Sequence, residues 1–433
     1  MESLTRRTAD AKSGEPKRPS PASADRTRIV VAGHICLDII PVLPAGTGRW
    51  NRIFTPGRLV QVGSALRATG GAVSNTGLAL HRLGLETRLL GKIGDDWIGR
   101  GILEILRSHA PRLAAGMLVV PGEQSSFTVV LNPPDVDRIF LHCPGANDTF
   151  SAADVTSGRL GSARLFHFGY PPVMRRMYRD FGRELALLFR RVKRRGLATS
   201  LDMAGIDPAS EAGRVDWMAL LRNVLPHVDL FLPSFEETVQ MLRPALSGKR
   251  AKRPSAENLP TGIDGPVLQA LADCLLEYGA AVVGLKLGDR GFYLRTTADR
   301  SRLAGLARAI PLRPDVWRDR ELLAPCYRVR VAGTTGAGDC AIAGFLAGLM
   351  HGLGPEDALQ CAAGAGACCV ERPDAVSGVP SWTALRKRIR SGWLQHPVAL
   401  SLPGWRWDKG RRLWRGPRDI EKNVGSVRTN ACP

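Results

Sequence analysis

Residues 331–350 read VAGTTGAGDCAIAGFLAGLM and place a glycine-rich turn directly before an apolar run. The first turn of a helix has N–H groups without partners and a partial positive charge. Because Gly336, Ala337 and Gly338 carry almost no side chain, they would leave such N–H groups open to an anion, typically phosphate. The periodicity of the apolar side chains predicts a helix that begins near Asp339. These side chains are Ile342, Phe345, Leu346 and Leu349.

Asp339 has two alternative roles at this position. As a residue of the first helical turn it would only cap the backbone. Beside a bound phosphate its negative charge is unfavourable, unless the carboxylate takes the proton from the group that attacks that phosphate. The stretch 331–350 is compatible with both roles, so the rest of the chain has to distinguish them.

The composition is that of a large globular protein. Of its 433 residues, 44% are hydrophobic, and no apolar run reaches the roughly 18 residues of a membrane span. Residues 1–28 lack the apolar core of a secretory signal. The nine cysteines include no CxxC pair, which favours reduced thiols over a disulfide or zinc framework. We therefore expect a cytoplasmic protein without a membrane partner.

The formal net charge of +20 is concentrated at the two ends of the chain. Residues 1–28 hold seven Lys and Arg against four Asp and Glu, and residues 385–433 hold twelve against three. Basic and aromatic residues together indicate either nucleic-acid binding or tryptophans that pack back onto the body of the protein. We favour packing and do not expect nucleic acid as a partner. The tryptophans concerned are Trp393, Trp405, Trp407 and Trp414.

The pattern along the chain predicts three parts. Residues 1–28 are polar and without periodicity, which predicts a disordered N-terminal extension. Residues 29–390 alternate strand-like and helix-like runs, which predicts an α/β domain whose parallel sheet is covered on both faces. Within them, the Arg- and Pro-rich residues 296–327 are expected to form a surface excursion. Residues 391–433 form a basic, Trp- and Arg-rich C-terminal tail.

Two further stretches carry candidate ligand-binding residues. Gly70 and Gly71 allow a ligand to approach the backbone closely, and the amide of Asn75 both donates and accepts hydrogen bonds. Asp38 follows the first predicted strand, at the carboxyl end of the sheet, where open α/β folds bind ligands. Each feature taken alone is equally compatible with a structural role, as a helix entrance or a turn carboxylate.

Taken together, five motifs resemble those of the ribokinase-like (PfkB) family of carbohydrate and nucleoside kinases. The resemblance implies a three-layer α/β/α sandwich with a mostly parallel sheet and a small β lid, formed near residues 50–66 and 125–143. It also implies an ATP-dependent phosphotransferase that acts with Mg²⁺ on a hydroxyl of a sugar or sugar derivative. The motifs occur in the family's order: GGAVSN at 70–75, KIGDDWIG at 92–99, PSFEE at 233–237, LKLGDRG at 285–291 and AGTTGAGD at 332–339.

The resemblance also implies roles for individual residues. Asp339 matches the catalytic base, and Gly336, Ala337 and Gly338 match the anion hole that steadies the phosphoryl group in transfer. Contacts to substrate hydroxyls are implied for Asp38, Gly70, Gly71 and Asn75. Contacts to ATP are implied for Ser234, Glu237, Lys286, Gly288 and Thr335, with Glu237 linked to Mg²⁺ indirectly, through water.

The chain departs from the family pattern at three positions. Ser234 replaces an asparagine near the nucleotide, and Lys286 stands where Thr or Ser is common. Gly333 replaces an aspartate that helps relatives hold a monovalent cation, which puts activation by potassium (K⁺) in doubt. Two alternatives stay open: a nucleoside kinase of the same fold, and a catalytically weak sugar- or nucleotide-binding relative whose tail binds a partner or nucleic acid. The resemblance further suggests a homodimer that pairs through the lid.

Overall fold

The structure is a computed structural model, and it describes residues 28–43, 55–132, 138–246 and 263–419. Residues 1–27 of the expected N-terminal extension and residues 50–54 of the first lid segment therefore lie outside the described residues. In the described part of the chain, no helix has both the length and the apolar character needed to cross a membrane. All cysteines in these ranges are free thiols.

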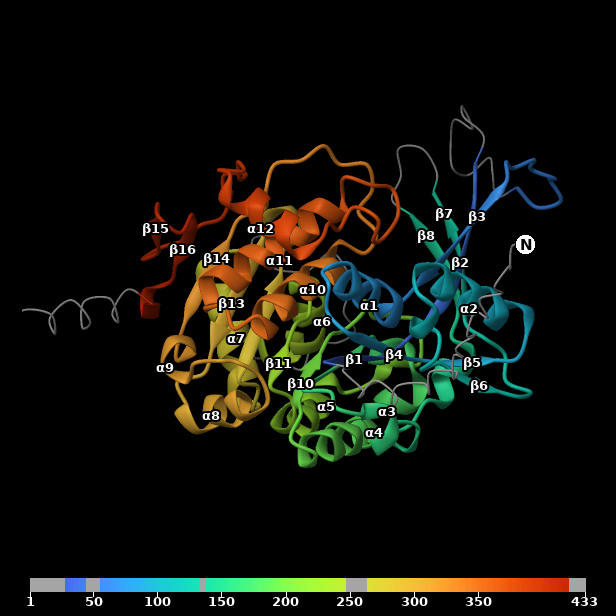
Figure 1. The fold of residues 1–433 in the computed structure, drawn as a ribbon, viewed down its shortest axis with the longest axis horizontal. Helices are drawn as coiled ribbons and strands as arrows, with labels where there is room; N and C mark the ends of the chain where they lie inside the picture. The colour runs from blue at the N-terminus through green and yellow to red at the C-terminus, as the bar shows by residue number, and fades with distance from the viewer. Residues whose placement is uncertain (1–27, 44–54, 133–137, 247–262, 420–433) are drawn as a thin grey trace, which may run out of the picture.

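Ten of the described strands build one large sheet in the order β15-β16-β14-β13-β12-β11-β10-β9-β1-β4 (Figure 1). From β4 to β12 every neighbouring pair is parallel, and from β12 to β15 every pair is antiparallel. The strands are β1 (Ile29–Gly33), β4 (Thr87–Leu90), β9 (Leu165–Gly169), β10 (Ala198–Leu201), β11 (Leu230–Phe231), β12 (Val282–Lys286), β13 (Phe292–Thr296), β14 (Glu321–Ala324), β15 (Arg406–Asp408) and β16 (Leu413–Arg415).

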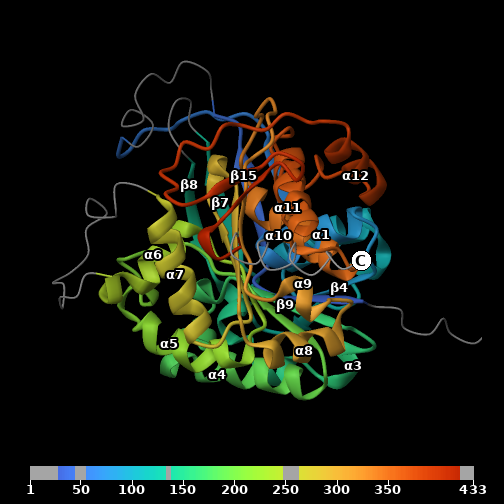
Figure 2. The ribbon, with the colours of Figure 1, turned by 90° about the vertical axis from the view of Figure 1, so that its left-hand side faces the viewer.

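Helices cover both faces of this sheet (Figure 2), which confirms the α/β sandwich. Alternate residues of β1 belong to two separate cores: Ile29 and Val31 face one, Val30 and Ala32 the other. One face carries α1 (Ala72–Arg82), α2 (Trp97–His109), α8 (Arg300–Ala309), α10 (Ala337–Met350), α11 (Pro355–Cys369) and α12 (Trp382–Arg390). The other carries α4 (Arg175–Arg194), α5 (Trp217–Val224), α6 (Phe235–Leu246) and α7 (Gly265–Glu277).

The sheet is more mixed than the expected mostly parallel arrangement. Residues 287–291 join β12 to β13 through a short turn, and a connection of that length can only reverse the chain. The surface excursion expected at 296–327 is wrong: these residues form α8, the short helix α9 (Pro314–Trp317) and the buried strand β14. Their arginines misled the prediction, because Arg320 lies inside, paired with Glu356 and Asp419.

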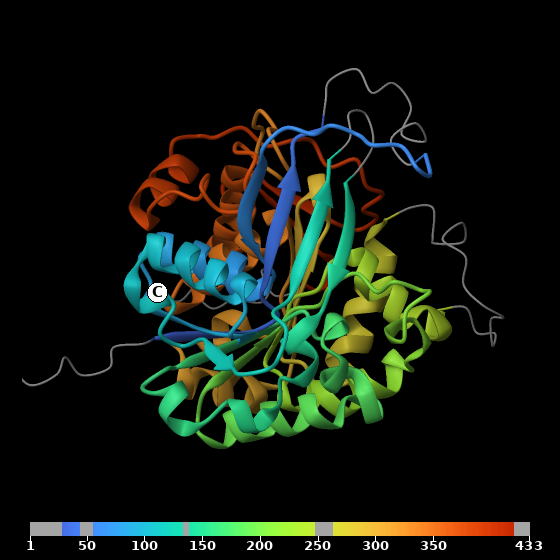
Figure 3. The ribbon, with the colours of Figure 1, turned by 90° about the vertical axis from the view of Figure 1, so that its right-hand side faces the viewer.

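Two features extend beyond the sandwich. A second sheet of four strands stands over the carboxyl ends of the parallel strands (Figure 3). In the tail, β16 pairs with β14 and β15 pairs with β16, so these two strands continue the large sheet. The tail's tryptophans pack: Trp405 lies 6.0 Å from the ring of Tyr293. The four-stranded sheet runs in the order β3 (Ala65–Gly70), β2 (Cys36–Pro41), β7 (Phe127–Leu131) and β8 (Ile139–Cys143).

Candidate active site

Helix α10 begins one residue after a left-handed glycine. Gly336 has φ +73° and ψ 0°, and a Cβ placed there would lie 2.6 Å from the carbonyl oxygen of Ala375. No other residue type fits without a shift of the backbone. The turn starts the helix at Ala337, so Asp339 is its third residue, and the first N–H groups of α10 have no partner within the helix.

Three donors from other parts of the chain hold the Asp339 carboxylate. Its Oδ2 accepts hydrogen bonds from Asn75 Nδ2 at 3.0 Å and from the Tyr170 hydroxyl at 2.8 Å. Its Oδ1 accepts from Thr76 Oγ1 at 3.3 Å. The side chain is only 3% exposed. Asp339 is thus fixed by side chains of α1 and of the segment after β9, and does not cap its own helix through its side chain.

The surroundings of Asp339 also set its proton affinity. Burial raises the pKa of its carboxyl, and the charge of Lys286 and the three hydrogen bonds offset part of that rise. Burial, together with the charges of Asp339 and Asp202, raises the pKa of Tyr170, so its hydroxyl keeps its proton and remains a donor. A carboxylate with a raised pKa accepts a proton more readily, which suits a general base.

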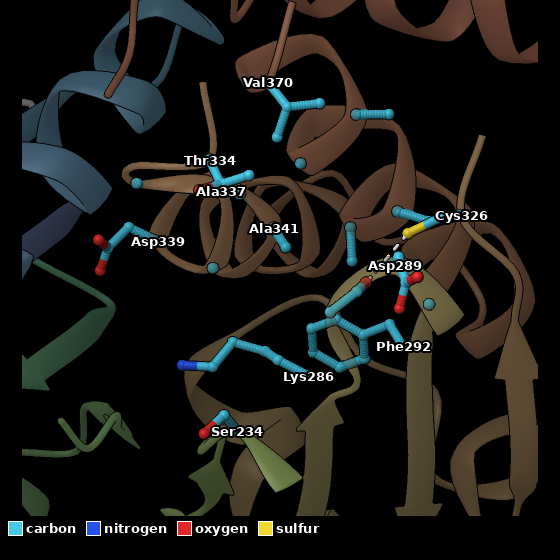
Figure 4. A pocket seen from close by; sticks show the side chains of 18 of the residues that line it. Ser234, Lys286, Asp289, Phe292, Cys326, Thr334, Ala337, Asp339, Ala341 and Val370 are labelled. Atoms are coloured by element: carbon cyan, nitrogen blue, oxygen red, sulfur yellow. Dashed lines mark hydrogen bonds between the residues drawn. The ribbon is translucent and has the colours of Figure 1, made fainter. Parts of the chain in front are cut away.

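A cavity of about 470 Å³ opens beside the start of α10. Its volume lies within the range of small-molecule sites. Figure 4 shows Lys286 and Asp339 at one end and Cys326 at the other. The polar end is lined by Tyr170, Ser234, Glu237, Lys286, Gly336, Gly338 and Asp339. The other end is mainly apolar and is lined by Cys326, Tyr327, Val329, Val331, Ala362, Ala363, Gly366, Val370 and His396.

Lys286 ends β12 and is the cation of the polar end. Its ammonium donates to Asp202 Oδ1 at 2.5 Å, while Oδ2 of this fully buried carboxylate has no partner among the described residues. Burial raises the pKa of Asp202 to about 8, because Lys286 offsets only part of the desolvation and the charges of Glu237 and Asp339 add to it. Burial alone would lower the pKa of Lys286, but the three carboxylates outweigh it, so the ammonium stays charged.

Ser234 and Glu237 support each other at the start of α6. Glu237 Oε2 accepts from the Ser234 N–H at 2.7 Å, and the Glu237 N–H donates to Ser234 Oγ at 3.1 Å. This reciprocal pair is a capping box and gives both residues a structural role. Both also line the cavity, so a second carboxylate oxygen of Glu237 remains available toward it.

The candidate substrate residues lie on the other side of Asp339, under the second sheet. Asp38 on β2 is opposite the end of β3, and a Cβ on Gly70 would lie 2.5 Å from Asp38 Oδ2. Gly71 has φ +87° and caps α1, where a Cβ would lie 2.5 Å from His34 Nδ1. Both glycines therefore make room for side chains. Burial raises the pKa of Asp38 to about 6, although hydrogen bonds to Cys36 and Thr128 lower it.

A chain of hydrogen bonds joins this region to the lid. Thr128 Oγ1 donates to Cys36 Sγ at 3.5 Å, and Cys36 Sγ donates to Asp38 Oδ1 at 3.3 Å. Thr128 Oγ1 also lies 3.0 Å from His142 Nδ1, and His142 Nε2 lies 3.3 Å from His34 Nε2. The ring tautomers decide which atom donates in these two contacts. The buried His34 Nδ1 has no partner in the described structure.

The structure brings some of the predicted residues together and separates others. Asn75 contacts Asp339 directly, and its buried Oδ1 has no partner in the described ranges. Gly288 lines the cavity, as predicted for a nucleotide contact, but Thr334 and not Thr335 lies on its wall. The Thr335 carbonyl instead accepts from the Cys369 thiol at 3.4 Å.

Sequence reasoning missed several polar residues of the site. Each of them is the first residue after a parallel strand: Asp202 follows β10, Tyr170 follows β9 and His34 follows β1. That position is itself a signal, because ligands bind at the carboxyl ends of such strands. The lid residue Arg138 was also missed; it donates to Thr334 Oγ1 at 2.7 Å and so links the second sheet to the turn before α10.

The polar end fits a nucleotide polyphosphate. The start of α10 and the Lys286 ammonium face a space that the lack of side chains at Gly336 and Gly338 keeps open, although the Ala337 N–H already donates to the Thr334 carbonyl at 3.4 Å. In the described ranges, no three His, Cys, Asp or Glu side chains form a ready-made metal site. A Mg²⁺ ion bound here would therefore rely on phosphate oxygens and water, and Glu237 is a carboxylate of the lining that could contact it.

Comparisons with known proteins agree with this geometry. The chain is 24% identical over 331 residues to the 2-dehydro-3-deoxygluconokinase of Bacillus subtilis, covering 75% of this chain and 87% of that protein. It is likewise 24% identical over 306 residues to an uncharacterized sugar kinase of Archaeoglobus fulgidus, covering 70% of this chain and 98% of that protein. Among solved structures, Arabidopsis thaliana ribokinase complexed with ribose and ATP superposes with a TM-score of 0.60 at 19% identity, covering 84% and 99%.

A fructokinase with bound ATP from Xylella fastidiosa superposes similarly, with a TM-score of 0.61 at 18% identity and coverages of 84% and 99%. Both structures are less than 25% identical in sequence to this chain, so their similarity establishes the fold alone. The family itself is established by the sequence, because the profile of the pfkB family carbohydrate kinases matches residues 26–382. The resemblance noted in the sequence is confirmed, and the chain belongs to the pfkB family of carbohydrate kinases.

Proposed function

We propose that the protein transfers the γ-phosphoryl group of ATP, in the presence of Mg²⁺, to a hydroxyl of an uncharged sugar or sugar derivative. The observation that carries this proposal is the position of Asp339. Its carboxylate is held by three donors at the start of α10, between the polar end of the cavity and the region under the lid. A structural cap would need none of these contacts.

The reaction assigns a task to each group. Asp339 takes the proton of the acceptor hydroxyl, whose oxygen forms a bond to the γ-phosphorus while the bond from that phosphorus to the bridging oxygen breaks, and ADP leaves. The backbone of the anion hole at 336–338 and the Lys286 ammonium stabilise the negative charge of the phosphoryl group in transfer. Bound Mg²⁺ neutralises phosphate charge. Tyr170, Asn75 and Thr76 keep the carboxylate oriented.

The chemistry under the lid favours an acceptor with several free hydroxyls. Asp38 offers a carboxylate, and two buried polar atoms, Asn75 Oδ1 and His34 Nδ1, lack partners in the described structure. A hydroxyl group both donates and accepts hydrogen bonds, so the hydroxyls of a sugar could pair with all three groups. A carboxylate or phosphate of the substrate placed beside Asp38 would meet a like charge. This supports a neutral polyol over a sugar acid or a sugar phosphate.

The test is the release of ADP from Mg-ATP across a panel of ketoses, aldoses, sugar acids, hexose phosphates and nucleosides. We expect turnover with a neutral ketose or aldose and none in the Asp339→Asn variant, which controls for contaminating kinases. Turnover with 2-dehydro-3-deoxygluconate alone would overturn the neutral class and keep the kinase. Turnover with nucleosides alone would favour the nucleoside kinase, and no turnover despite ATP binding would favour a binding protein.

We further propose that two copies pair through their lids. Support comes from the outer strands of the second sheet, where two large apolar side chains on the same face are exposed: Leu66 on β3 is 60% exposed and Phe140 on β8 is 54% exposed. An exposed apolar sheet surface is typical of an association site. Sedimentation should give a dimer for the native chain and a monomer for Leu66→Asp, and a native monomer would contradict the proposal.

A further inference from the structure

The apolar end of the cavity has a wall that comes from the C-terminal tail. The cavity extends from Lys286 toward Cys326 (Figure 4), and its lining includes the apolar side chains of Val329, Val331, Ala363 and Val370. If ATP binds with its phosphates at the α10 turn, as proposed above, this apolar region receives the nucleobase. One residue of the lining, His396, belongs to the tail. It lies 14 residues beyond residue 382, where the family match ends.

Backbone hydrogen bonds fix the tail segment 393–396 against the cavity wall at 326–328. The His396 N–H donates to the carbonyl of Cys326 at 2.8 Å, and the Arg328 N–H donates to the carbonyl of Leu394 at 2.8 Å. Tyr327 and Gln395 form an antiparallel bridge between them. The segment is therefore an added strand alongside the wall, and the position of His396 is determined by backbone pairing.

Side chains clamp the same segment from the other side. The indole of Trp393 stacks on the ring of Tyr327, with centroids 4.3 Å apart and planes 17° apart, and Arg388 lies 3.8 Å over that indole. The indole N–H donates to the Arg328 carbonyl at 3.0 Å. Gln395 Nε2 donates to the carbonyl of Pro325 at 3.2 Å. A segment with this many contacts forms a fixed wall.

His396 differs from Tyr327 and Cys326, the polar residues beside it in the wall. The Tyr327 hydroxyl donates to Gln360 Oε1 at 2.6 Å, and the Cys326 thiol donates to the Gly288 carbonyl at 3.2 Å. The imidazole of His396 is exposed and makes no hydrogen bond to another described residue. Its planar ring, with one donor and one acceptor nitrogen, can lie against a planar heterocycle or bond to its edge.

We propose that His396 contacts the nucleobase of ATP, and that the segment 393–396 is a wall of the nucleobase site. This inference rests on the proposed function, since it presupposes that the cavity binds ATP. It gives the tail a role in the site and needs no nucleic-acid or protein partner. The contact involves the base alone, because the phosphates lie at the other end of the cavity, near Lys286 and Gly338.

Calorimetric titration of the full chain with Mg-ATP and with magnesium tripolyphosphate tests the proposal. The His396→Ala variant should bind ATP about tenfold more weakly, which is the order expected for one ring contact to a base. Tripolyphosphate has no base, so its affinity should stay unchanged. The matched control is Leu394→Ala: its side chain is 66% exposed and is not part of the cavity lining, so its removal should leave both affinities unchanged.

Two results would overturn the inference alone. Wild-type affinity for ATP in His396→Ala would show that the ring makes no contact, and an equal loss for ATP and tripolyphosphate would show a general distortion of the site. If the unmodified protein binds neither ligand, the proposed function fails together with this inference. If it binds tripolyphosphate and ATP equally, the kinase proposal stands and the nucleobase site is refuted.

Discussion

The two ends of the cavity are built by different principles. At the polar end the charged side chains of Lys286 and Asp339 are held by partners from other elements, Asp202 and Asn75. At the apolar end the walls are aliphatic, and the outer wall is held by backbone pairing of the tail to residues 326–328. The polar end lies at the carboxyl ends of parallel strands, whereas the tail reaches the apolar end from beyond α12.

This difference has an energetic origin. A buried charge without a partner costs several kcal/mol, so the polar end tolerates few residue types at few positions. A hydrophobic wall needs volume and flatness, and many sequences supply them. Substitutions at the polar end should therefore change catalysis by orders of magnitude, while those at the apolar end should change nucleotide affinity modestly. The following predictions test that contrast, starting with the largest effect.

Asp339→Asn should have the largest effect. We expect kcat to fall by about 10³-fold, within the 10²–10⁴-fold range of general base catalysis. The amide has nearly the same shape and keeps a hydrogen-bonding group at each position, so the KM for ATP and the melting temperature should change little. Steady-state kinetics and thermal unfolding check both. Loss of stability in place of loss of kcat would indicate that Asp339 is a structural cap.

Lys286→Met should affect both catalysis and stability. Removing the ammonium takes away a donor to the transferring phosphoryl group, and kcat should fall by about 10²-fold. It also leaves Asp202 buried without its cation, which costs up to about 3–5 kcal/mol of unfolding free energy. Urea denaturation and steady-state kinetics measure the two losses.

The stability loss in Lys286→Met should depend on pH in a defined direction. The pKa of Asp202 is already raised to about 8, and loss of Lys286 raises it further. When the pKa of Asp202 is higher in the folded than in the unfolded state, the folded protein binds more protons between these two pKa values. The unfolding free energy of the variant should therefore fall as pH rises from about 4 through 8. The double variant Lys286→Met with Asp202→Asn should regain stability but not activity. Equal stability at pH 5 and pH 8 would contradict this assignment.

The polar end could be predicted from the sequence because its residues lie in short motifs. TGAGD at 335–339 predicts the helix start, the open N–H groups and the carboxylate from local rules alone. The α/β layering followed from the alternation of apolar runs. What the motif could not predict is which side chains hold Asp339. Asn75 and Tyr170 are 264 and 169 residues away from it in sequence, and only the folded sheet brings them together.

The antiparallel edge and the tail could not be predicted for a related reason. Residues 296–327 and 391–419 are rich in arginine, which by composition indicates a solvated surface. In the structure Arg320 and Arg415 are nearly buried, because Asp419, Glu356 and Asp408 neutralise them. Pairing between distant charges hides the apolar character of a segment from any local rule. The same holds for His396, whose place at the cavity depends on backbone pairing with residue 326.

Asp38→Asn should have an intermediate effect, confined to the sugar acceptor. A hydrogen bond to a charged group is worth about 1.5–3 kcal/mol, so the KM for the acceptor should rise by about tenfold or more at pH 7.5. Because the pKa of Asp38 is about 6, the native enzyme should lose acceptor affinity as pH falls through 6. The variant should show no such inflection. A pH profile of kcat/KM for the acceptor, at saturating ATP, measures both.

The Asp38 carboxyl should also change the pH dependence of stability. Its pKa is raised by burial, whereas the pKa of a carboxyl in a favourable ion pair is lowered, so the two change stability in opposite directions as pH rises. Its folded-state pKa lies above the unfolded value of about 3.9, so the folded chain binds more protons between pH 4 and 6. As pH rises from 4 to 6, the unfolding free energy of the native protein should therefore fall relative to that of Asp38→Asn. Parallel slopes for the two proteins would show that Asp38 is not buried in the way described.

Replacement of potassium should have the smallest effect. Gly333 stands where many relatives carry an aspartate, and a Cβ there would lie 3.0 Å from both the Cα and the carbonyl oxygen of Pro373, so no larger residue fits without a shift. Behind the turn, the Ala375 carbonyl accepts from the thiols of Cys340 and Cys369, each at 3.2 Å. This carbonyl oxygen behind the turn is thus already hydrogen-bonded.

Exchanging K⁺ for tetramethylammonium at constant ionic strength should therefore change kcat by less than about twofold, or ~0.4 kcal/mol of activation free energy. This result would show that a monovalent cation is not needed at the polar end. The N–H groups of α10 and the Lys286 ammonium would then stabilise the transferring phosphoryl group by themselves. A tenfold stimulation by K⁺, absent with Na⁺, would instead require the turn at 333–336 to rearrange when the cation binds. The thiol contacts of Ala375 would then have to break, and Cys369→Ala should strengthen the stimulation.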